Sequence, residues 1–283
     1  MAENTSQAES PIKKSLHPAI VPIAIVIAGG LIGASIYFSR TVTPGAPKAS
    51  DNPALVIKSD DHIVGNPKAK IVVIEYSDLE CPYCKGYNTT TTRLLDTYGA
   101  SGDMALVFRH FPLDVIHKKS AKEAEATECA AELGGNEAFW KYLNGVFDVT
   151  PSNDGLDLAQ LPVIAEKIGL DKTAFQSCLD SGRHADDVTN DQNEGLSLGV
   201  QGTPYSIFIL EQGTYFVMNG AFPFEMVDML VKATLGGAPA TASQGLIDLV
   251  QKQGVTQANI DAYVRQYLVQ YLPKTDATTQ PQQ

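Results

Sequence analysis

The chain has 283 residues, of which 44% are hydrophobic, and carries a formal net charge of −11 at pH 7. Its length allows one sizeable domain with appendages or two small domains, and so acidic a surface argues against nucleic-acid binding. Four cysteines are present, too few for a disulfide-dense scaffold. Only Cys81 and Cys84 lie close together, whereas a tetrahedral zinc site usually needs two close-spaced ligand pairs, so neither a metal nor a cofactor is expected.

An uncharged apolar run, residues 19–38, lies near the N-terminus. As a helix, a run of this length spans about 30 Å, the hydrocarbon thickness of a bilayer. Lys13 and Lys14 precede it, which favours a single-pass membrane anchor with residues 1–18 in the cytoplasm. A cleaved signal peptide is the alternative, although the run is long for one. Either interpretation predicts an exported domain, periplasmic or on the outer face of the cell membrane, where disulfides persist.

A small, polar, proline-bearing stretch, residues 39–52, predicts a linker, and strands and helices are expected beyond it. Four apolar, β-branched runs predict strands: residues 70–76, 104–109, 205–210 and 214–218. Helices are expected from the cysteine pair to about 98, then at about 118–133, 137–148, 157–168, 171–180, 185–197 and 223–234. This order, βαβ, a helical block over about 118–198, then ββα, predicts one α/β domain over 53–235.

A second linker over residues 236–242 separates this domain from a C-terminal helical extension, residues 242–273. Two amphipathic helices are expected there, at about 244–253 and 256–271. The apolar face of the second helix either packs back on the domain or docks a partner. The tail over residues 274–283 has the composition of a disordered segment.

The run Cys81-Pro82-Tyr83-Cys84 carries the chemistry expected of this chain. A helix N-terminus offers unpaired amide N–H groups and the positive end of the helix dipole, so it stabilises a thiolate and lowers the pKa of Cys81. We therefore expect Cys81 to be an exposed nucleophile at the N-cap and Cys84 to be the resolving thiol one turn further on. Pro82 suits the first helical position. Two inert cysteines in a core helix are the alternative.

Residues 65–84, which contain this run, resemble the DsbA-like thiol–disulfide oxidoreductases, a family with the thioredoxin fold. Shorter matching motifs follow in the same order, at residues 108–112, 128–130, 169–179 and 198–204. The resemblance covers about residues 55–235. It implies a thioredoxin-like α/β fold (βαβ…ββα) with an inserted helical domain, which is also the order that the segment patterns predict.

The resemblance implies further site residues. Pro204 would follow a cis peptide bond beside the disulfide, exposing the backbone of Thr203 to an extended substrate chain. An ordinary trans turn proline is the alternative. Cys129 and Cys178 occupy positions where the family often carries cysteines, which implies a structural disulfide between two inserted helices. Two buried free cysteines are the alternative.

Glu75 lies six residues before Cys81, on the first strand. The resemblance implies a buried acid there, beneath the second cysteine, and such an acid can exchange a proton with Cys84. Because side chains alternate along a strand, Glu75 shares a face with Val73, which is consistent with burial. An acid that faces solvent at a strand end is the alternative.

The direction of electron flow is left open by the sequence. The best-known oxidases of the family carry Pro-His between their cysteines, whereas Tyr83 cannot place a positive charge near the thiolate at neutral pH. Glu80 is expected to raise the pKa of Cys81 by like-charge repulsion. We interpret His110 and His117 as structural or solvated residues.

The sequence is compatible with three functions. The first is an extracytoplasmic oxidase that passes its disulfide to exported proteins through a Cys81 mixed disulfide; the resemblance implies a quinone-linked membrane partner that reoxidises it. The second is a membrane-anchored disulfide reductase or isomerase fed with electrons across the membrane. The third, from a different class, is a binding or chaperone module with a vestigial redox pair.

Overall fold

The computed structural model describes residue 49 and residues 52–237, all within one compact unit of the chain, residues 46–283. The predicted anchor, most of the first linker and the C-terminal extension lie outside the described residues. No helix within the described part is long and apolar enough to cross a membrane. The anchor and the C-terminal helices therefore stay predictions.

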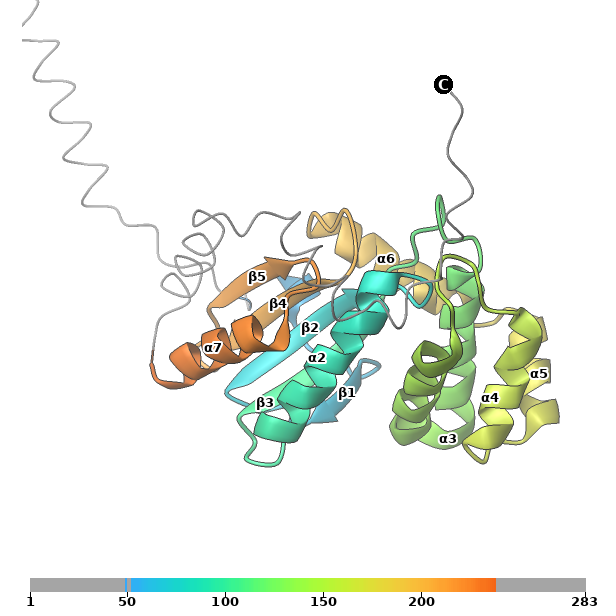
Figure 1. Ribbon diagram of the computed structural model, residues 1–283, viewed down its shortest axis with the longest axis horizontal. Helices are drawn as coiled ribbons and strands as arrows, with labels where there is room; N and C mark the ends of the chain where they lie inside the picture. The colour runs from blue at the N-terminus through green and yellow to red at the C-terminus, as the bar shows by residue number, and fades with distance from the viewer. Residues whose placement is uncertain (1–48, 50–51, 238–283) are drawn as a thin grey trace, which may run out of the picture. The chain divides into compact units, whose positions relative to one another are not determined.

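A mixed five-stranded sheet in the order β1-β3-β2-β4-β5 forms the centre of the domain (Figure 1). Its strands are β1 (His62–Gly65), β2 (Ile71–Ser77), β3 (Met104–His110), β4 (Tyr205–Leu210) and β5 (Tyr215–Asn219). Only β2 and β3 run parallel; the other neighbours are antiparallel. The four predicted strands are confirmed. The strand β1 was not predicted, because it is a short, half-buried edge strand without an apolar run.

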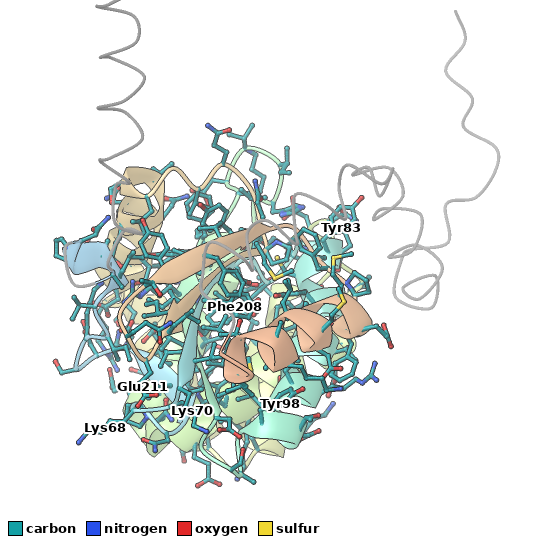
Figure 2. The ribbon with its side chains drawn as sticks, turned by 90° about the vertical axis from the view of Figure 1, so that its left-hand side faces the viewer. Lys68, Lys70, Tyr83, Tyr98, Phe208 and Glu211 are labelled. Carbon is teal, nitrogen blue, oxygen red and sulfur yellow. A yellow bond between two sulfur atoms is a disulfide. The ribbon has the colours of Figure 1, made fainter. Side chains whose placement is uncertain are left out.

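Two helices, α2 (Pro82–Tyr98) and α7 (Phe224–Leu235), cover one face of the sheet (Figure 1). Their apolar sides, which include Leu94 and Leu230, share a buried cluster with Ile71 of β2 and Phe208 of β4. Phe208 lies inside this layer in Figure 2. β2 and β3 are central and buried on both faces, so they carry the continuous apolar runs from which the sequence predicts strands.

The helical block lies between β3 and β4, as expected. It consists of α3 (Ser120–Val149), the 3₁₀ turn η3 (Leu158–Gln160), α4 (Leu161–Lys167), α5 (Lys172–Ser181) and α6 (Ala185–Ser197). The two helices predicted over 118–148 are confirmed: they are the two segments of α3, which meet at a kink at Gly135, where the backbone is not helical (φ 72°, ψ −170°). Helices α3, α4 and α5 share an apolar core that also contains Cys81 and Cys84. The cysteine pair therefore lies where the sheet domain meets the insertion.

The opposite face of the sheet is closed by α6 and by the segment before β1. Arg109, at the end of β3, has a fully buried side chain that joins them. Its Nε donates to Asp61 Oδ1 at 2.8 Å, and its guanidinium also donates to Glu194 Oε1 on α6 at 2.5 Å. A third bond reaches the carbonyl oxygen of Ala54 at 2.6 Å, within the 3₁₀ turn η2 (Pro53–Leu55). One buried cation thus fixes three segments to the strand that leads towards the site.

Candidate active site

Cys81 is the N-cap residue of α2, and Cys84 lies in its first turn. Pro82 occupies the first helical position, where its missing N–H would have no intrahelical partner, so α2 begins where the sequence predicts. Cys81 has extended backbone angles (φ −78°, ψ 120°), and its carbonyl accepts the first helical bond, from the Lys85 N–H at 3.1 Å. Both cysteines are free thiols in this structure. Tyr83 lies at the periphery of the domain, at the end where α2 begins (Figure 2).

The pKa values of the two thiols are shifted in opposite directions. Hydrogen bonds from the Cys84 thiol and, more weakly, from the Cys84 backbone N–H lower the pKa of Cys81 against the opposing effects of burial and of Asp78. Burial raises the pKa of Cys84 well above its usual value, and its bond to the Cys81 sulfur raises it further. The shift of the Cys81 pKa has the predicted direction, and Cys81 is the more acidic thiol of the pair.

Cys81 is less accessible than expected. Only 3% of its surface is exposed, so the prediction of an exposed nucleophile is wrong. The sulfur is covered by the chain before β4: its Sγ lies 3.6 Å from the carbonyl oxygen of Thr203. The Thr203 backbone is therefore part of the immediate surroundings of Cys81.

The predicted cis peptide bond is present between Thr203 and Pro204. It lies immediately before β4, and the Pro204 carbonyl accepts a hydrogen bond from the Gly220 N–H at 2.9 Å, which ties the bond to the end of β5. Together with the Cys81 contact, these bonds place Thr203 beside the reactive sulfur, where the resemblance put it. That Thr203 pairs with a substrate chain stays a prediction.

Glu75 is buried on β2, between Phe108 of β3 and Ser206 of β4 in register. Burial raises its pKa to about 7, against a smaller lowering effect of Ser77. Ser77 follows on the same face of the strand and also acts on the Cys84 thiol, whose pKa it lowers. Burial of Glu75 is thus confirmed. Proton exchange with Cys84 stays a prediction.

Asp78 and His117 are site residues that sequence reasoning missed. His117 was interpreted as structural or solvated, yet it is buried, and its Nδ1 lies 3.0 Å from Asp78 Oδ2. Asp78 lies in the turn between β2 and α2, and its backbone N–H faces the Cys84 sulfur at 3.5 Å. The position of Asp78, three residues before Cys81, was the only signal in the sequence, and nothing there paired it with a histidine 39 residues away.

Glu80, which was expected to act on Cys81, instead contacts the loop after α3. Its carboxylate accepts hydrogen bonds from the Thr150 hydroxyl at 3.1 Å and from the Gly155 N–H at 3.1 Å, so it anchors the loop after α3. The carboxylate that raises the pKa of Cys81 is that of Asp78 instead. Behind Glu80 lies Glu123 of α3, whose pKa burial and the neighbouring Glu80 raise to about 10. Glu123 is therefore uncharged at neutral pH.

A family model described as Thioredoxin matches residues 58–216, more than half of the chain. The chain belongs to the thioredoxin family.

Among solved structures, the chain is similar to DsbA proteins. A variant of alpha-DsbA1 from Wolbachia pipientis is 26% identical, with a TM-score of 0.58 over 66% of this chain and 96% of that chain. DsbA2 from Pseudomonas aeruginosa is 28% identical, with a TM-score of 0.52 over 64% of this chain and 97% of that one. The thioredoxin domain is thus DsbA-like, with the helical insertion that the resemblance implied.

The curated relatives that match this chain in sequence are named as sodium–proton antiporters. The Na(+)/H(+) antiporter NhaA 3 of Salinispora tropica is 35% identical over 51% of this chain and 21% of that protein. NhaA 1 of Salinispora arenicola is 30% identical over 62% of this chain and 25% of that protein. The chain thus spans a fifth to a quarter of the length of these relatives.

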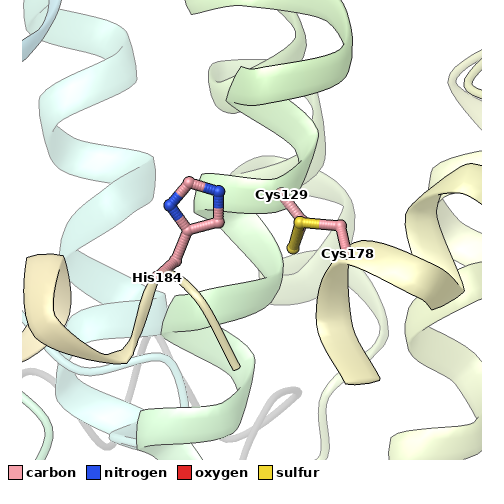
Figure 3. A group of neighbouring side chains, drawn as sticks. All are labelled: Cys129, Cys178 and His184. Carbon is pink, nitrogen blue, oxygen red and sulfur yellow. A yellow bond between two sulfur atoms is a disulfide. The ribbon is translucent and has the colours of Figure 1, made fainter. Parts of the chain in front are cut away.

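The second cysteine pair of the thioredoxin-family domain is a disulfide, Cys129–Cys178, that joins α3 to α5 (Figure 3). The structural bond implied by the resemblance is confirmed. His184 lies beside it, so that one nitrogen and both sulfurs lie within 4.8 Å of one another. Both sulfurs are used by the disulfide, and the imidazole nitrogens contact Glu132 at 3.0 Å and Asp187 at 2.7 Å. As folded, the trio offers a metal ion no free sulfur ligand.

An open groove of about 540 Å³ adjoins the cis-proline segment. The loop after β3, residues 111–116, forms one side, and α6 with residues 200–201 forms the other. Val115 is 85% exposed and Ile116 is 64% exposed, and Leu196 of α6 is exposed as well. Because Gln201 lies two residues before Thr203, an apolar surface lies close in sequence to the backbone that covers Cys81.

Proposed function

We propose that this DsbA-like domain is an extracytoplasmic thiol–disulfide oxidoreductase that introduces disulfides into exported proteins. The observation that carries the proposal is the pair itself: Cys81, a thiol with a lowered pKa at a helix N-terminus, lies beside the buried Cys84 thiol and the Thr203 carbonyl. A thiolate of low pKa is a good leaving group, so a disulfide that contains Cys81 is readily transferred.

The exchange proceeds in two displacements at sulfur. A substrate thiolate attacks Cys81 Sγ of the oxidised pair, the Cys81–Cys84 bond breaks, and Cys84 leaves and takes up a proton, as its raised pKa favours. The second substrate thiol then loses its proton and attacks the substrate sulfur of the mixed disulfide, releasing the Cys81 thiolate. The substrate loses two electrons and the pair gains them; the proton that the second substrate thiol releases balances the proton that Cys84 takes up.

The surroundings of the pair support an unfolded protein as the substrate. The groove beside the cis-proline segment exposes Val115 and Ile116, which can contact apolar side chains of an extended chain. The Thr203 backbone beside Cys81 can pair with the backbone of such a chain, as the family resemblance implies.

Export is supported by the Cys129–Cys178 disulfide, since such bonds persist in oxidising compartments. The apolar run over residues 19–38 would tether the domain to the cell membrane. The antiporters that match this chain in sequence are in keeping with a place at a membrane. Reoxidation would then fall to a quinone-linked membrane partner.

One observation favours the second candidate, a disulfide reductase or isomerase. The Asp78 carboxylate raises the pKa of Cys81, and a less stable thiolate makes a weaker oxidant. The redox state of the Cys81–Cys84 pair in cells separates the two. The oxidase predicts a pair that is mostly disulfide at steady state, whereas a mostly reduced pair would indicate reductase or isomerase activity.

A Cys84→Ser variant of the full chain tests the exchange itself. Without the resolving thiol, Cys81 should accumulate as mixed disulfides with exported proteins, visible as bands that a reductant removes. The matched control is Cys81→Ser, which keeps one thiol but lacks the nucleophile and should trap nothing. Equal trapping by both variants, or by neither, would leave the binding or chaperone module as the better description.

A further inference from the structure

The side chain of His117 is held in one position beside the cysteine pair. It belongs to the loop between β3 and α3 and is 4% exposed. Its Nδ1 bonds Asp78 Oδ2 at 3.0 Å, and the same carboxylate accepts the Leu113 N–H at 2.7 Å and the Glu80 N–H at 2.8 Å. Since each of these bonds involves a buried or half-buried group, neither the ring nor its partner is free to turn towards solvent.

The turn that holds His117 also presents both sulfurs. The Asp78 N–H faces Cys84 Sγ at 3.5 Å, and the Asp78 carbonyl accepts the Cys81 N–H at 3.2 Å. The histidine, the carboxylate and the two thiols therefore form one connected unit at the junction of the sheet and the insertion.

The charges that face His117 come from three elements. Asp78 lies in the turn before α2, Cys81 at the start of α2, and Asp154 in the loop after α3. Burial lowers the pKa of His117, but these three groups outweigh it, so the pKa is raised and the imidazolium is favoured. On the imidazole's own loop, Lys119 is used elsewhere, since its Nζ donates to the carbonyl oxygens of Asp154 and Leu156.

The acids behind this unit do not cancel the imidazolium. The Glu80 carboxylate accepts hydrogen bonds from the loop after α3, and the Glu123 carboxyl keeps its proton at neutral pH. Asp78, by contrast, raises the pKa of both cysteines. A positive charge on the ring bound to Asp78 offsets that repulsion at Cys81.

We propose that His117, held by Asp78, is a positioning residue whose imidazolium stabilises the Cys81 thiolate, and that it supplies from the loop after β3 the positive charge that the Pro82-Tyr83 insert lacks. This inference rests on the proposed exchange at Cys81. It places the charge behind the pair and inside the protein, so that the insert itself stays free to face a substrate.

The test compares His117→Asn with the wild-type full chain. Asparagine can still donate a hydrogen bond towards Asp78 but carries no charge, so the turn is kept while the charge is removed. The pH titration of the Cys81 thiolate, followed by ultraviolet absorbance in the reduced protein, should move to higher pH. The equilibrium constant for oxidising glutathione should fall about tenfold, equivalent to about 30 mV. His184→Asn, which removes an imidazole bound to carboxylates far along the insertion, is the matched control and should change neither value.

A merely structural role for His117 would lower the unfolding temperature and leave the thiolate titration and the glutathione equilibrium unchanged; that result overturns the inference. If His117→Asn does not fold, nuclear magnetic resonance titration of His117 in the wild-type chain decides. The imidazole should titrate at higher pH in the reduced than in the oxidised protein, and identical titrations would overturn the inference. Mixed disulfides trapped by Cys84→Ser would still support the exchange, so the two proposals can fail separately.

Discussion

Replacing Glu75 by glutamine tests how the buried acid on β2 acts on the fold and on the pair. In the folded chain burial raises the pKa of this carboxyl from 4.5 to about 7. The folded state therefore holds the proton more tightly than the unfolded chain. Stability is lost as pH rises from the unfolded pKa to the folded pKa, and the full penalty applies above pH 7. At about 1.4 kcal/mol per pKa unit, the penalty is about 1 kcal/mol at pH 5 and about 3 kcal/mol at pH 8.

Glutamine has nearly the same shape and stays uncharged, so any fixed cost of the amide is equal at both pH values. Urea unfolding should show that Glu75→Gln gains about 2 kcal/mol relative to wild type between pH 5 and pH 8. Glu211→Gln, on the exposed turn after β4, is the control and should show no such gain. If the wild-type carboxyl also exchanges a proton with Cys84, the variant should resolve its Cys81 mixed disulfides through Cys84 more slowly at neutral pH. A stability difference that is the same at both pH values would refute the burial argument.

Two further predictions concern stability. The double substitution Cys129→Ala/Cys178→Ala removes a disulfide whose cysteines lie 49 residues apart in sequence, so urea unfolding should show that the free energy of unfolding falls by about 4 kcal/mol. The thiolate titration of the Cys81–Cys84 pair should stay as in wild type. A fall of less than about 1 kcal/mol would mean that the apolar core of the insertion already holds α3 to α5. Arg109→Met leaves Asp61 and Glu194 without their buried cation, so the free energy of unfolding should fall by about 3 to 5 kcal/mol, and an unchanged thermal midpoint would contradict this.

The parts that the sequence predicted are those set by local rules. Pro82 at a helix start, the alternation around Glu75 and the apolar runs of β2 and β3 each depend on a few neighbouring residues. The family resemblance added the cis bond before Pro204 and the Cys129–Cys178 pairing, which join positions far apart in sequence.

The parts that were missed depend on tertiary contacts. The strand β1 has no apolar run of its own and exists because its backbone pairs with β3. Cys81 is buried because the Thr203 segment lies over it. The Asp78–His117 pair forms only once the loop after β3 folds against the turn before α2. Each of these features needs the approach of a second segment, which single-sequence patterns do not encode.

The origin of the charge at the pair has a consequence for pH. In an insert of the Pro-His type the histidine stands beside the cysteines, whereas here the imidazole is buried and its pKa is raised by Asp78, Cys81 and Asp154 against the effect of burial. A raised pKa keeps His117 charged to a higher pH than an ordinary exposed histidine. Its stabilisation of the Cys81 thiolate is therefore lost as pH rises through the raised value. Because the reduced pair carries that thiolate, loss of the imidazolium makes the pair a weaker oxidant at alkaline pH, beyond the change expected from cysteine ionisation alone.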